Sequence, residues 1–455
     1  MKSVALHPIS KVTSIVAIPG SKSYTNRALL IAAMTNNPVT IWNPLISDDT
    51  NAMVECLEKL GIRCEFNPSF VISKEERLRN PQEISHPSGF EMTIKPQSIE
   101  VINSIADIKE QNYQLNAHLS GTTIRFLLAL LCRVAGTKIL TGEEGLNKRP
   151  IKDLVDGLRQ LGATIEYLEQ EGFPPLRISS SQLTPGEISL KGTISSQYFS
   201  AILMIAPLVG EISIKVIGTQ VSKPYIDMTI DTMKHFGVNV IQKNYEQYTV
   251  LGGQKYSATE YAVEGDYSSA GYFAAIAALT ESTLTLKNLN YDSAQADRTF
   301  LDVLERMGNQ IEKKDDEVCI IGKGVMPLEI DMIDCPDQIQ TLAVLAAFAK
   351  GETKIHGIES LRVKETNRVV AIEQELKKMG IPTQSTEHTL TIQGGNPQPA
   401  TIDTYGDHRM AMSFAVAGTK IDGIVINDPD VVNKTFPEFW TKLKEISIQI
   451  EYQNP

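Results

Sequence analysis

Apolar and polar positions follow one pattern six times along the chain. In each copy an amphipathic helix pattern ends in an apolar residue plus Gly, as in Cys56-Leu-Glu-Lys-Leu-Gly61, and a strand-like run follows. Gly after the last helical turn predicts a C-cap, because Gly readily adopts a positive φ. The same signal predicts C-caps at Gly162, Gly237, Gly308 and Gly380, and in a degenerate form at Ser447.

A second series of helices keeps the same period. These helices are more apolar, and they begin after polar turns at Ser21, Ser120, Ser195, Ser268, Asp337 and Asp407. Short β-rich runs lie between the two helices of each unit, around Ile41, Ile139, Val216, Leu286, Ile355 and Ile426. The period of about 70 residues predicts six repeated units of mixed α and β structure. The first unit is longer, and its polar stretch at about 64–119 predicts an insertion of loops or an extra hairpin.

Composition and charge narrow the class of protein. The chain has 455 residues, of which 42% are hydrophobic and 21% charged, as expected for a globular protein of two or three domains. Its net charge of −11 argues against nucleic acid or an anionic membrane as a partner, although a local cationic pocket is compatible with it. We recognise no targeting segment and no run of about 18 apolar residues. The five cysteines form no C-x-x-C pair and predict reduced thiols, so we expect a cytoplasmic protein.

The segment Pro19-Gly-Ser-Lys-Ser-Tyr-Thr-Asn-Arg27 is the first candidate binding site. It ends a strand-like run and opens an Ala/Leu-rich helix, whose first N–H groups lack partners and attract anions. Lys22, Arg27 and two hydroxyls strengthen that attraction. The G-x-x-x-x-G-K-[ST] spacing of a Walker P-loop is absent. An ordinary helix cap with solvated cations is the alternative interpretation of this segment.

Further cations cluster near other predicted helix starts. Lys364 and Arg368 fall four residues apart in a helix predicted over 361–379, with Glu365 beside them. Like charges so placed repel by roughly 0.2–0.5 kcal/mol in water, which indicates a nearby anion, although a solvated helix face is the simpler interpretation. Additional candidates are Arg149, His408, Arg409, Lys434 and the uncharged segment Ser195-Ser-Gln197.

Metal and cofactor chemistry is poorly supported by the sequence. The seven His and five Cys never fall at metal-ligand spacing. Neither a G-x-S-x-G elbow nor a G-x-G-x-x-G fingerprint occurs. We therefore expect no metal and no cofactor, and a polyanionic ligand bound by Lys and Arg.

Taken together, these segments resemble the 5-enolpyruvylshikimate-3-phosphate synthase family, in family order and over nearly the whole chain. The matching segments are Pro19-Gly-Ser-Lys-Ser-x-x-Asn-Arg27, Gly121-Thr-x-x-Arg125, Lys148-Arg-Pro-Ile151, Ser195-Ser-Gln197, Val221-Ser-Lys-Pro-Tyr-Ile-Asp227, Glu264-Gly-Asp266, Pro336-Asp337, Arg362-Val-Lys-Glu-Thr-x-Arg368, Asp407-His-Arg-Met-Ala-Met412 and Lys434-Thr-Phe-Pro437. Each segment alone is weak evidence, whereas the ordered set is highly specific.

The resemblance implies an α/β fold, a two-domain inside-out α/β barrel with three βαβαββ repeats in each domain. It places residues 21–263 in one domain, with the insertion at about 64–119, and residues 1–20 and 264–455 in the other. The active site is then expected in the interdomain cleft. Because the helix starts carry many cations, we also expect them to repel across an empty cleft.

The resemblance also implies a reaction and its residues. In that family the enolpyruvyl group of phosphoenolpyruvate passes to the 5-hydroxyl of shikimate 3-phosphate, and phosphate is released. By this match Asp337 is the base, Glu365 is the acid, and Lys22 contacts both substrates. Shikimate 3-phosphate would be held by Lys22, Ser23, Arg27, Ser195, Ser196, Ser222, Tyr225, Asp337, Ser360 and Lys364. Phosphoenolpyruvate would be held by Lys22, Gly121, Arg149, Gln197, Arg368, Arg409 and Lys434.

Two positions depart from the family pattern. The family usually has Asn before the Ala/Ser-Gly-Thr turn, where this chain has Leu119, and usually has Asn where Ser360 stands. We expect changed affinity and not a lost reaction. The alternatives are the related UDP-N-acetylglucosamine enolpyruvyl transferase and a non-catalytic phosphometabolite-binding protein. For each we expect small-molecule ligands and a monomer.

Overall fold

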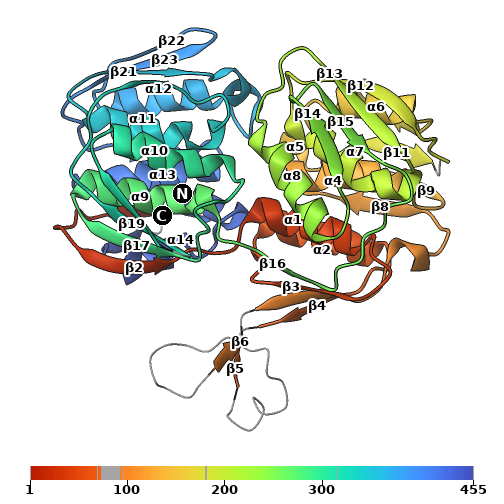
Figure 1. Ribbon diagram of the computed structural model, residues 1–455. Helices are drawn as coiled ribbons and strands as arrows, with labels where there is room; N and C mark the ends of the chain where they lie inside the picture. The colour runs from red at the N-terminus through yellow and green to blue at the C-terminus, as the bar shows by residue number, and fades with distance from the viewer. Residues whose placement is uncertain are drawn as a thin grey trace.

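The computed structural model describes residues 2–68, 70–72, 93–95, 97–179, 182–314 and 316–453. They form two α/β domains that lie side by side (Figure 1). One buried hydrophobic cluster draws its members from residues 24–263, and the other from residues 4–18 and 267–448. These two cores support the expected division of the chain, and we propose the boundaries 21–263 for the first domain and 1–20 with 264–455 for the second.

The first domain contains three four-stranded sheets, each with one parallel and two antiparallel strand pairs. Their strand orders are β16 (Glu260–Ala262), β3 (Val39–Trp42), β7 (Ser98–Val101), β4 (Cys64–Asn67); β10 (Thr164–Tyr167), β11 (Leu176–Ser179), β9 (Thr137–Thr141), β8 (Tyr113–Asn116); and β12 (Gly186–Lys191), β13 (Ile212–Ile217), β15 (Gln247–Val250), β14 (Val240–Lys243).

The second domain repeats this arrangement. Its strand orders are β18 (Gln310–Lys314), β19 (Glu317–Ile321), β17 (Thr283–Lys287), β2 (Thr13–Ala17); β20 (Glu329–Asp331), β21 (Gly351–His356), β23 (Thr389–Gly394), β22 (Thr383–Ser385); and β24 (Thr401–Ile402), β25 (Ile424–Asn427), β1 (Ser3–Leu6), β26 (Ile450–Gln453). The N-terminal strand β1 thus lies inside the last sheet, between two strands from the C-terminal end of the chain.

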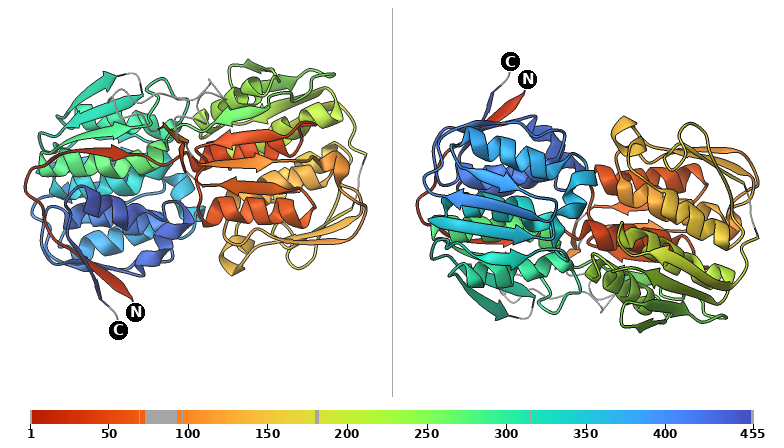
Figure 2. Two further views of the ribbon diagram at one scale, coloured as in Figure 1. Left: turned by 90° about the horizontal axis from the view of Figure 1, so that it is seen from below. Right: turned by 90° about the horizontal axis from the view of Figure 1, so that it is seen from above.

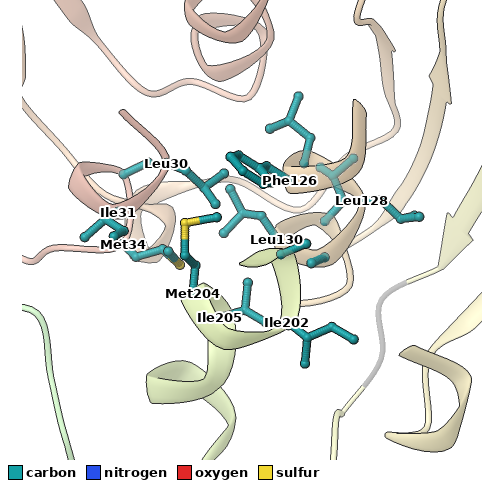
Figure 3. Close-up of a cluster of buried hydrophobic side chains, with 14 of the residues drawn as sticks. Leu30, Ile31, Met34, Phe126, Leu128, Leu130, Ile202, Met204 and Ile205 are labelled. Atoms are coloured by element: carbon teal, nitrogen blue, oxygen red, sulfur yellow. The ribbon is translucent and has the colours of Figure 1, made fainter. Parts of the chain in front are cut away.

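Six apolar helices supply much of the two buried cores. Figure 2 shows the two domains from below and from above. The six helices are α1 (Lys22–Ala32), α4 (Gly121–Leu131), α7 (Ser196–Val209), α9 (Tyr267–Thr280), α11 (Ile339–Phe348) and α13 (His408–Gly418). All 11 residues of α4 and all 11 of α13 are buried. A helix that is apolar on every side belongs in an interior. In the first domain Leu30 of α1, Phe126 of α4 and Met204 of α7 point into one common core (Figure 3).

The other six helices of the repeat are amphipathic and end where the sequence predicts. They are α2 (Asp48–Lys59), α6 (Lys152–Gln160), α8 (Pro224–His235), α10 (Thr299–Arg306), α12 (Arg368–Lys378) and α14 (Phe439–Glu445). The predicted capping residue after each helix has a positive φ, from 69° at Ser447 to 104° at Gly308. The six-fold repeat and its period are therefore confirmed.

The two connections between the domains pair with each other. Gly20 and Gly265 form an antiparallel bridge, flanked by hydrogen bonds from Ser21 N to the Glu264 carbonyl (2.8 Å) and from Asp266 N to the Pro19 carbonyl (2.9 Å). A Cβ on either Gly would lie 2.0 Å from a carbonyl oxygen, so only Gly fits this close approach. The junction between the domains is thus a short pair of antiparallel segments.

Two local predictions need correction or restriction. The helix predicted over 361–379 is broken: a 3-10 turn (Glu359–Val363) ends before Lys364, and α12 begins only at Arg368. The Asn367 side chain accepts a hydrogen bond from Val370 N and caps α12, so Lys364 and Arg368 do not share a helix face. Of the predicted insertion, β5 (Phe70–Ile72) pairs antiparallel with β6 (Thr93–Lys95), and most of the remaining residues between Asn67 and Ser98 lie outside the described residues.

The helices within the described ranges include none with the length and apolar character needed to cross a bilayer. The five cysteines are free thiols, as the sequence predicts.

Candidate active site

A cavity between the domains collects most of the predicted substrate-binding residues. It is lined by residues from the first turns of α1, α4, α7, α9 and α13, for example Lys22 of α1, Thr122 of α4 and Arg409 of α13, and by Asp337 of the 3-10 turn before α11. Nine of the ten residues predicted for shikimate 3-phosphate line it: Lys22, Ser23, Ser195, Ser196, Ser222, Tyr225, Asp337, Ser360 and Lys364.

A second, adjoining cavity collects most of the other predicted set. Six of the seven residues predicted for phosphoenolpyruvate line it: Lys22, Gly121, Arg149, Gln197, Arg368 and Arg409. The seventh, Lys434, has its Nζ 3.2 Å from Oε1 of Glu365, which is itself part of the lining. Eight residues line both cavities, with Lys22, Asp337 and Arg409 among them, so ligands in them would contact common side chains.

The helix starts around these cavities differ in how their N–H groups are satisfied. Ser120, Ser195, Asp266 and Asp407 accept hydrogen bonds from the first turns of α4, α7, α9 and α13. The residues that precede α1 and α11 make no such side-chain bond. The N-terminus of α1, beside Lys22, is therefore one of two that keep uncapped N–H groups able to attract an anion.

Asp337 lies where the two cavities meet and is surrounded by cations. Its Oδ2 accepts from Nη2 of Arg409 (2.8 Å), and its Oδ1 accepts from Nη1 of Arg368 (3.1 Å) and lies 3.7 Å from Nζ of Lys364. The Tyr225 hydroxyl also donates to Oδ2 (3.3 Å). Burial alone would raise the pKa of Asp337, but the surrounding cations, Arg409 first, hold it well below its usual range.

Glu365 has a similar environment on the other side of the second cavity. Its Oε2 accepts from Nη2 of Arg368 (2.9 Å), while Oε1 lies 3.2 Å from Nζ of Lys434 and 3.6 Å from Nη1 of Arg149. Burial would raise the pKa of Glu365, yet these cations, Lys434 first, outweigh it and hold the pKa well below its usual range. With these protein groups around it, this carboxyl is ionised at neutral pH.

Arg368 joins both carboxylates and is almost completely buried. Beyond Asp337 and Glu365 it donates from Nε and Nη2 to the two carboxylate oxygens of Asp407, at 2.7 and 3.3 Å. A bidentate pair of this kind fixes the plane of the guanidinium. Asp407 thus fixes the position of the Arg368 guanidinium. The same carboxylate also caps the N-terminus of α13.

Carboxylates alternate with cations across the cleft, which corrects the expectation of simple repulsion. Asp49 of the first domain is buried, with Lys22 Nζ at 3.1 Å and Lys434 Nζ of the second domain at 3.4 Å. Lys434 Nζ also donates to the carbonyl of Leu119 (2.9 Å). Contacts of opposite charge therefore connect the two domains at this edge of the site. The main chain of Leu119 makes this contact although its side chain is not the usual Asn.

Gly121 gives the cationic groups room. A Cβ at this position would lie 2.9 Å from Nη1 of Arg149 and 3.2 Å from Nη1 of Arg125. Arg125 in turn donates to Oε1 of Gln197. Gly121 therefore leaves space for two guanidinium groups at the wall of the second cavity, and a Cβ at this position would force them to shift.

Arg27, like Lys434, is absent from both cavity linings. Its guanidinium is buried and donates to Oγ1 of Thr229 (2.8 Å) and to the carbonyls of Ser23 and Tyr225 (both 2.9 Å). Burial lowers its pKa to about 10. Arg27 thus positions Ser23 and Tyr225, and its direct contact with substrate stays a prediction.

Two further residues have unusual environments. Ser222, which precedes α8, has a φ of 52°, a left-handed conformation that costs a non-Gly residue on the order of 1–3 kcal/mol. His408 is buried, and its ring nitrogens make no hydrogen bond within the described part of the chain. Burial and then the charge of Arg409 hold the pKa of His408 well below its usual range, so the ring is neutral at neutral pH.

Sequence reasoning missed several residues of the site. Asp49 follows Ser47-Asp48 at the start of α2, and nothing in the local pattern separates it from an ordinary helix-opening acid. Arg125 is part of a matched segment but received no role. Asp297 and Ser268 also lie near Asp337 and are considered below. Among the described residues no group of three or more His, Cys, Asp or Glu side chains could hold a metal ion.

Comparison with known proteins gives one consistent result. A family model described as EPSP synthase (3-phosphoshikimate 1-carboxyvinyltransferase) matches residues 6–87 and 89–443. The 3-phosphoshikimate 1-carboxyvinyltransferase of Vibrio cholerae serotype O1 (strain M66-2) is 40% identical over 450 residues, which are 98% of this chain and 100% of that protein. The protein of the same name from Sulfurovum sp. (strain NBC37-1) is 41% identical over 450 residues, with the same coverage.

A solved structure of EPSP synthase from Acinetobacter baumannii matches the fold, with a TM-score of 0.80, 24% sequence identity and full coverage of both chains. The repeated α/β architecture and the inside-out arrangement are therefore shared. The ordered motifs, the whole-length family match and the common fold lead to one conclusion: the chain belongs to the EPSP synthase (3-phosphoshikimate 1-carboxyvinyltransferase) family.

Proposed function

We propose that this protein transfers the enolpyruvyl group of phosphoenolpyruvate to the 5-hydroxyl of shikimate 3-phosphate and releases phosphate. The main support is the meeting of two predicted residue sets in adjoining cavities that share Lys22, Asp337 and Arg409. One chain supplies all of these residues, so the reaction needs no second copy and we expect a monomer.

The cavities suit two anionic substrates that lie side by side. In the first, the hydroxyls of Ser195, Ser196 and Ser222 and the cation of Lys364 offer hydrogen bonds to a phosphate and to ring hydroxyls. In the second, Arg149, Arg368 and Arg409 offer the planar, multidentate donors that carboxylate and phosphate groups favour. Lys22, beside the free N-terminus of α1, contacts both ligands.

Asp337 acts as the base that accepts the 5-hydroxyl proton. In the free protein its pKa is held too low for an efficient base by Arg409, Lys364, Arg368 and Lys22. The phosphate and carboxylate of bound phosphoenolpyruvate place negative charge beside Arg368 and Arg409, which reduces the net positive field at Asp337. Substrate binding thus raises the pKa of the base toward the working pH, where general base catalysis is most effective.

Glu365 acts as the acid that protonates the methylene carbon of phosphoenolpyruvate. It is ionised in the free protein, so the proton must come with substrate binding. Phosphate placed between Lys434, Arg149 and Arg368 offsets the cations that hold the pKa of Glu365 low. Glu365 then takes up a proton from solvent and delivers it to the carbon, while the nearby cations stabilise the charged tetrahedral intermediate. In the elimination that follows, the C–O bond to phosphate breaks, and Glu365, again ionised, takes one proton back from the methyl group as phosphate leaves.

The test is a phosphate-release assay with defined substrate pairs. We expect release with phosphoenolpyruvate plus shikimate 3-phosphate, and none when UDP-N-acetylglucosamine replaces shikimate 3-phosphate. Release only with UDP-N-acetylglucosamine would overturn the proposed acceptor. Tight binding of both proposed substrates without turnover would instead support a non-catalytic binding protein.

A further inference from the structure

A second buried carboxylate lies behind Asp337, and the reaction described above does not use it. Asp297 belongs to a 3-10 turn (Ala296–Arg298) before α10, and it is only 4% exposed. It is absent from the linings of both cavities. A buried carboxylate is costly unless it is paired or hydrogen-bonded, so its partners indicate what it does.

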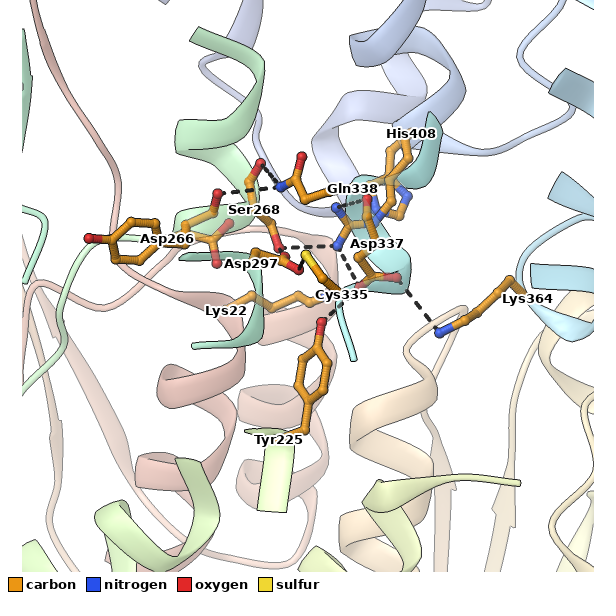
Figure 4. Close-up of polar contacts among 12 residues, drawn as sticks. Lys22, Tyr225, Asp266, Ser268, Asp297, Cys335, Asp337, Gln338, Lys364 and His408 are labelled. Carbon is orange, nitrogen blue, oxygen red and sulfur yellow. Dashed lines mark hydrogen bonds and ion pairs between the residues drawn. The ribbon is translucent and has the colours of Figure 1, made fainter. Parts of the chain in front are cut away.

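Both oxygens of Asp297 accept hydrogen bonds from residues next to the site. The Ser268 hydroxyl donates to Oδ2, and the Cys335 thiol donates to Oδ1 at 3.4 Å. The Ser268 oxygen itself accepts from Nη2 of Arg409 at 3.4 Å, and the same nitrogen donates to Oδ2 of Asp337 at 2.8 Å. Arg409 therefore lies between two carboxylates, with Asp337 on the cavity side and Asp297 behind Ser268. Figure 4 shows this arrangement around Ser268, Asp297, Cys335 and Asp337.

The charged and titratable groups that act on Asp297 come from four neighbouring elements. They are Asp266 at the start of α9, Cys335 and Asp337 around the 3-10 turn before α11, Arg409 on α13 and Tyr225 on α8. Among these, Arg409 is the only cation. Its charge is thus shared between Asp297 and Asp337.

We propose that Asp297 is a positioning residue for this reaction, which fixes Arg409 through the Ser268 hydroxyl and offsets the charge that Arg409 exerts on Asp337. This inference rests on the proposed function, because it assigns Asp337 the role of base. It has two parts. Asp297 holds the guanidinium at the junction of the two cavities, and it keeps the Asp337 carboxylate more basic than Arg409 alone would leave it.

The electrostatic part follows from like-charge interaction. A carboxylate near a second carboxylate makes protonation of both easier, so each raises the pKa of the other. Burial and then the charge of Asp337 raise the pKa of Asp297 to about 6, which is the effect expected of two carboxylates on either side of one arginine. Loss of the Asp297 charge should therefore lower the pKa of Asp337 and weaken it as a base.

The test compares pH–rate profiles of Asp297→Asn and the natural protein in the phosphate-release assay. We expect the acid limb of kcat to move down by about one pH unit, since a nearby charge shifts a pKa by that order. We expect kcat on the plateau to fall by up to about tenfold. A base whose pKa is one unit lower is about tenfold weaker, and this sets the upper limit of the effect on the proton-transfer rate. Asp292→Asn removes the same charge from an exposed position of the same segment and should leave both quantities unchanged.

Ser268→Ala separates the two parts of the proposal. It removes the hydroxyl that connects Asp297 to Arg409 and leaves every charge in place. We expect a higher KM for phosphoenolpyruvate, whose proposed partner Arg409 is less well held, and an acid limb that does not move. This variant also carries the test if Asp297→Asn does not fold, which circular dichroism and thermal melting would reveal.

The outcomes are distinct. If kcat of Asp297→Asn is lower at every pH while the acid limb stays in place, Asp297 has a purely structural role. An unchanged KM for phosphoenolpyruvate in Ser268→Ala would overturn the positioning of Arg409. Failure of the natural protein to turn over the two substrates would overturn the proposed function itself, and it is measured first.

Discussion

Replacement of Asp337 by Asn removes one negative charge from the junction of the two cavities and keeps the size of the side chain. If Asp337 is the base, the variant cannot accept the hydroxyl proton. General base catalysis contributes about 10²–10⁴-fold, which corresponds to about 2.7–5.4 kcal/mol of activation free energy. We therefore expect kcat to fall by that factor.

Substrate binding should survive this change, because the cavity becomes more positive by one charge. Arg368 still pairs with Glu365 and Asp407 at 2.9 and 2.7 Å. Arg409 loses its ion pair at 2.8 Å, at a cost in stability of about 1.5–3 kcal/mol, the usual contribution of a hydrogen bond to a charged group. The melting temperature of the free variant should thus drop and recover when anionic substrates bind.

Steady-state phosphate release gives kcat, titration calorimetry gives the Kd of shikimate 3-phosphate, and thermal melting with and without substrates measures stability. Asp331→Asn is a matched control, since its exposed side chain accepts a hydrogen bond from Ile333 N (2.9 Å) that Asn can also accept. A variant at position 337 that keeps kcat within about threefold of the natural value would refute the assignment of Asp337 as base.

Three other changes test separate parts of the site. Gly121→Ala places a Cβ 2.9 Å from Nη1 of Arg149, so the KM of phosphoenolpyruvate should rise about tenfold, with little change for shikimate 3-phosphate; equal changes in both would contradict this. Lys434→Met removes the ion pair with Asp49 (3.4 Å) across the cleft, so small-angle scattering should show a more open substrate-free protein, and an identical profile would exclude that role. Below pH 6.5 the unfolded chain protonates His408 but the folded protein does not, because its pKa is held low, so stability falls as the pH drops from 7 to 5. His408→Asn should flatten this slope by up to about 1.4 kcal/mol per pH unit in urea unfolding, and equal slopes would argue against a buried neutral ring.

Much of the fold could be predicted from the sequence because each repeated unit contains its own helix C-cap signal. Gly61 and its five counterparts mark helix ends whose φ values are positive in the structure, including Ser447. The break between Val363 and Arg368 was not predictable from charge spacing. There the side chain of Asn367 caps α12, and the local preference for a cap prevails over the continuous helical pattern.

The site was predictable only where ordered motifs carry it. The segments that contain Lys22, Asp337 and Glu365 are recognisable, and their side chains meet as expected. Asp49 and Asp297 are different, because each is an isolated acid whose importance depends on which cation the fold places beside it. That information is in the packing of α2 and of the turn before α10, and no local spacing encodes it.

The position of β1 has a consequence for biosynthesis. β1 precedes every other described strand in the chain, but its two neighbours in the sheet, β25 and β26, are the last two described strands to be translated. The first domain has all of its strands once Ala262 has emerged, since β16 completes its sheet beside β3. The second domain must wait for β25 and β26, and until then Val4 and Leu6, both buried in the folded protein, have no sheet to join. The order of synthesis therefore favours a first domain that folds during translation and a second that completes its last sheet only once β26 has emerged.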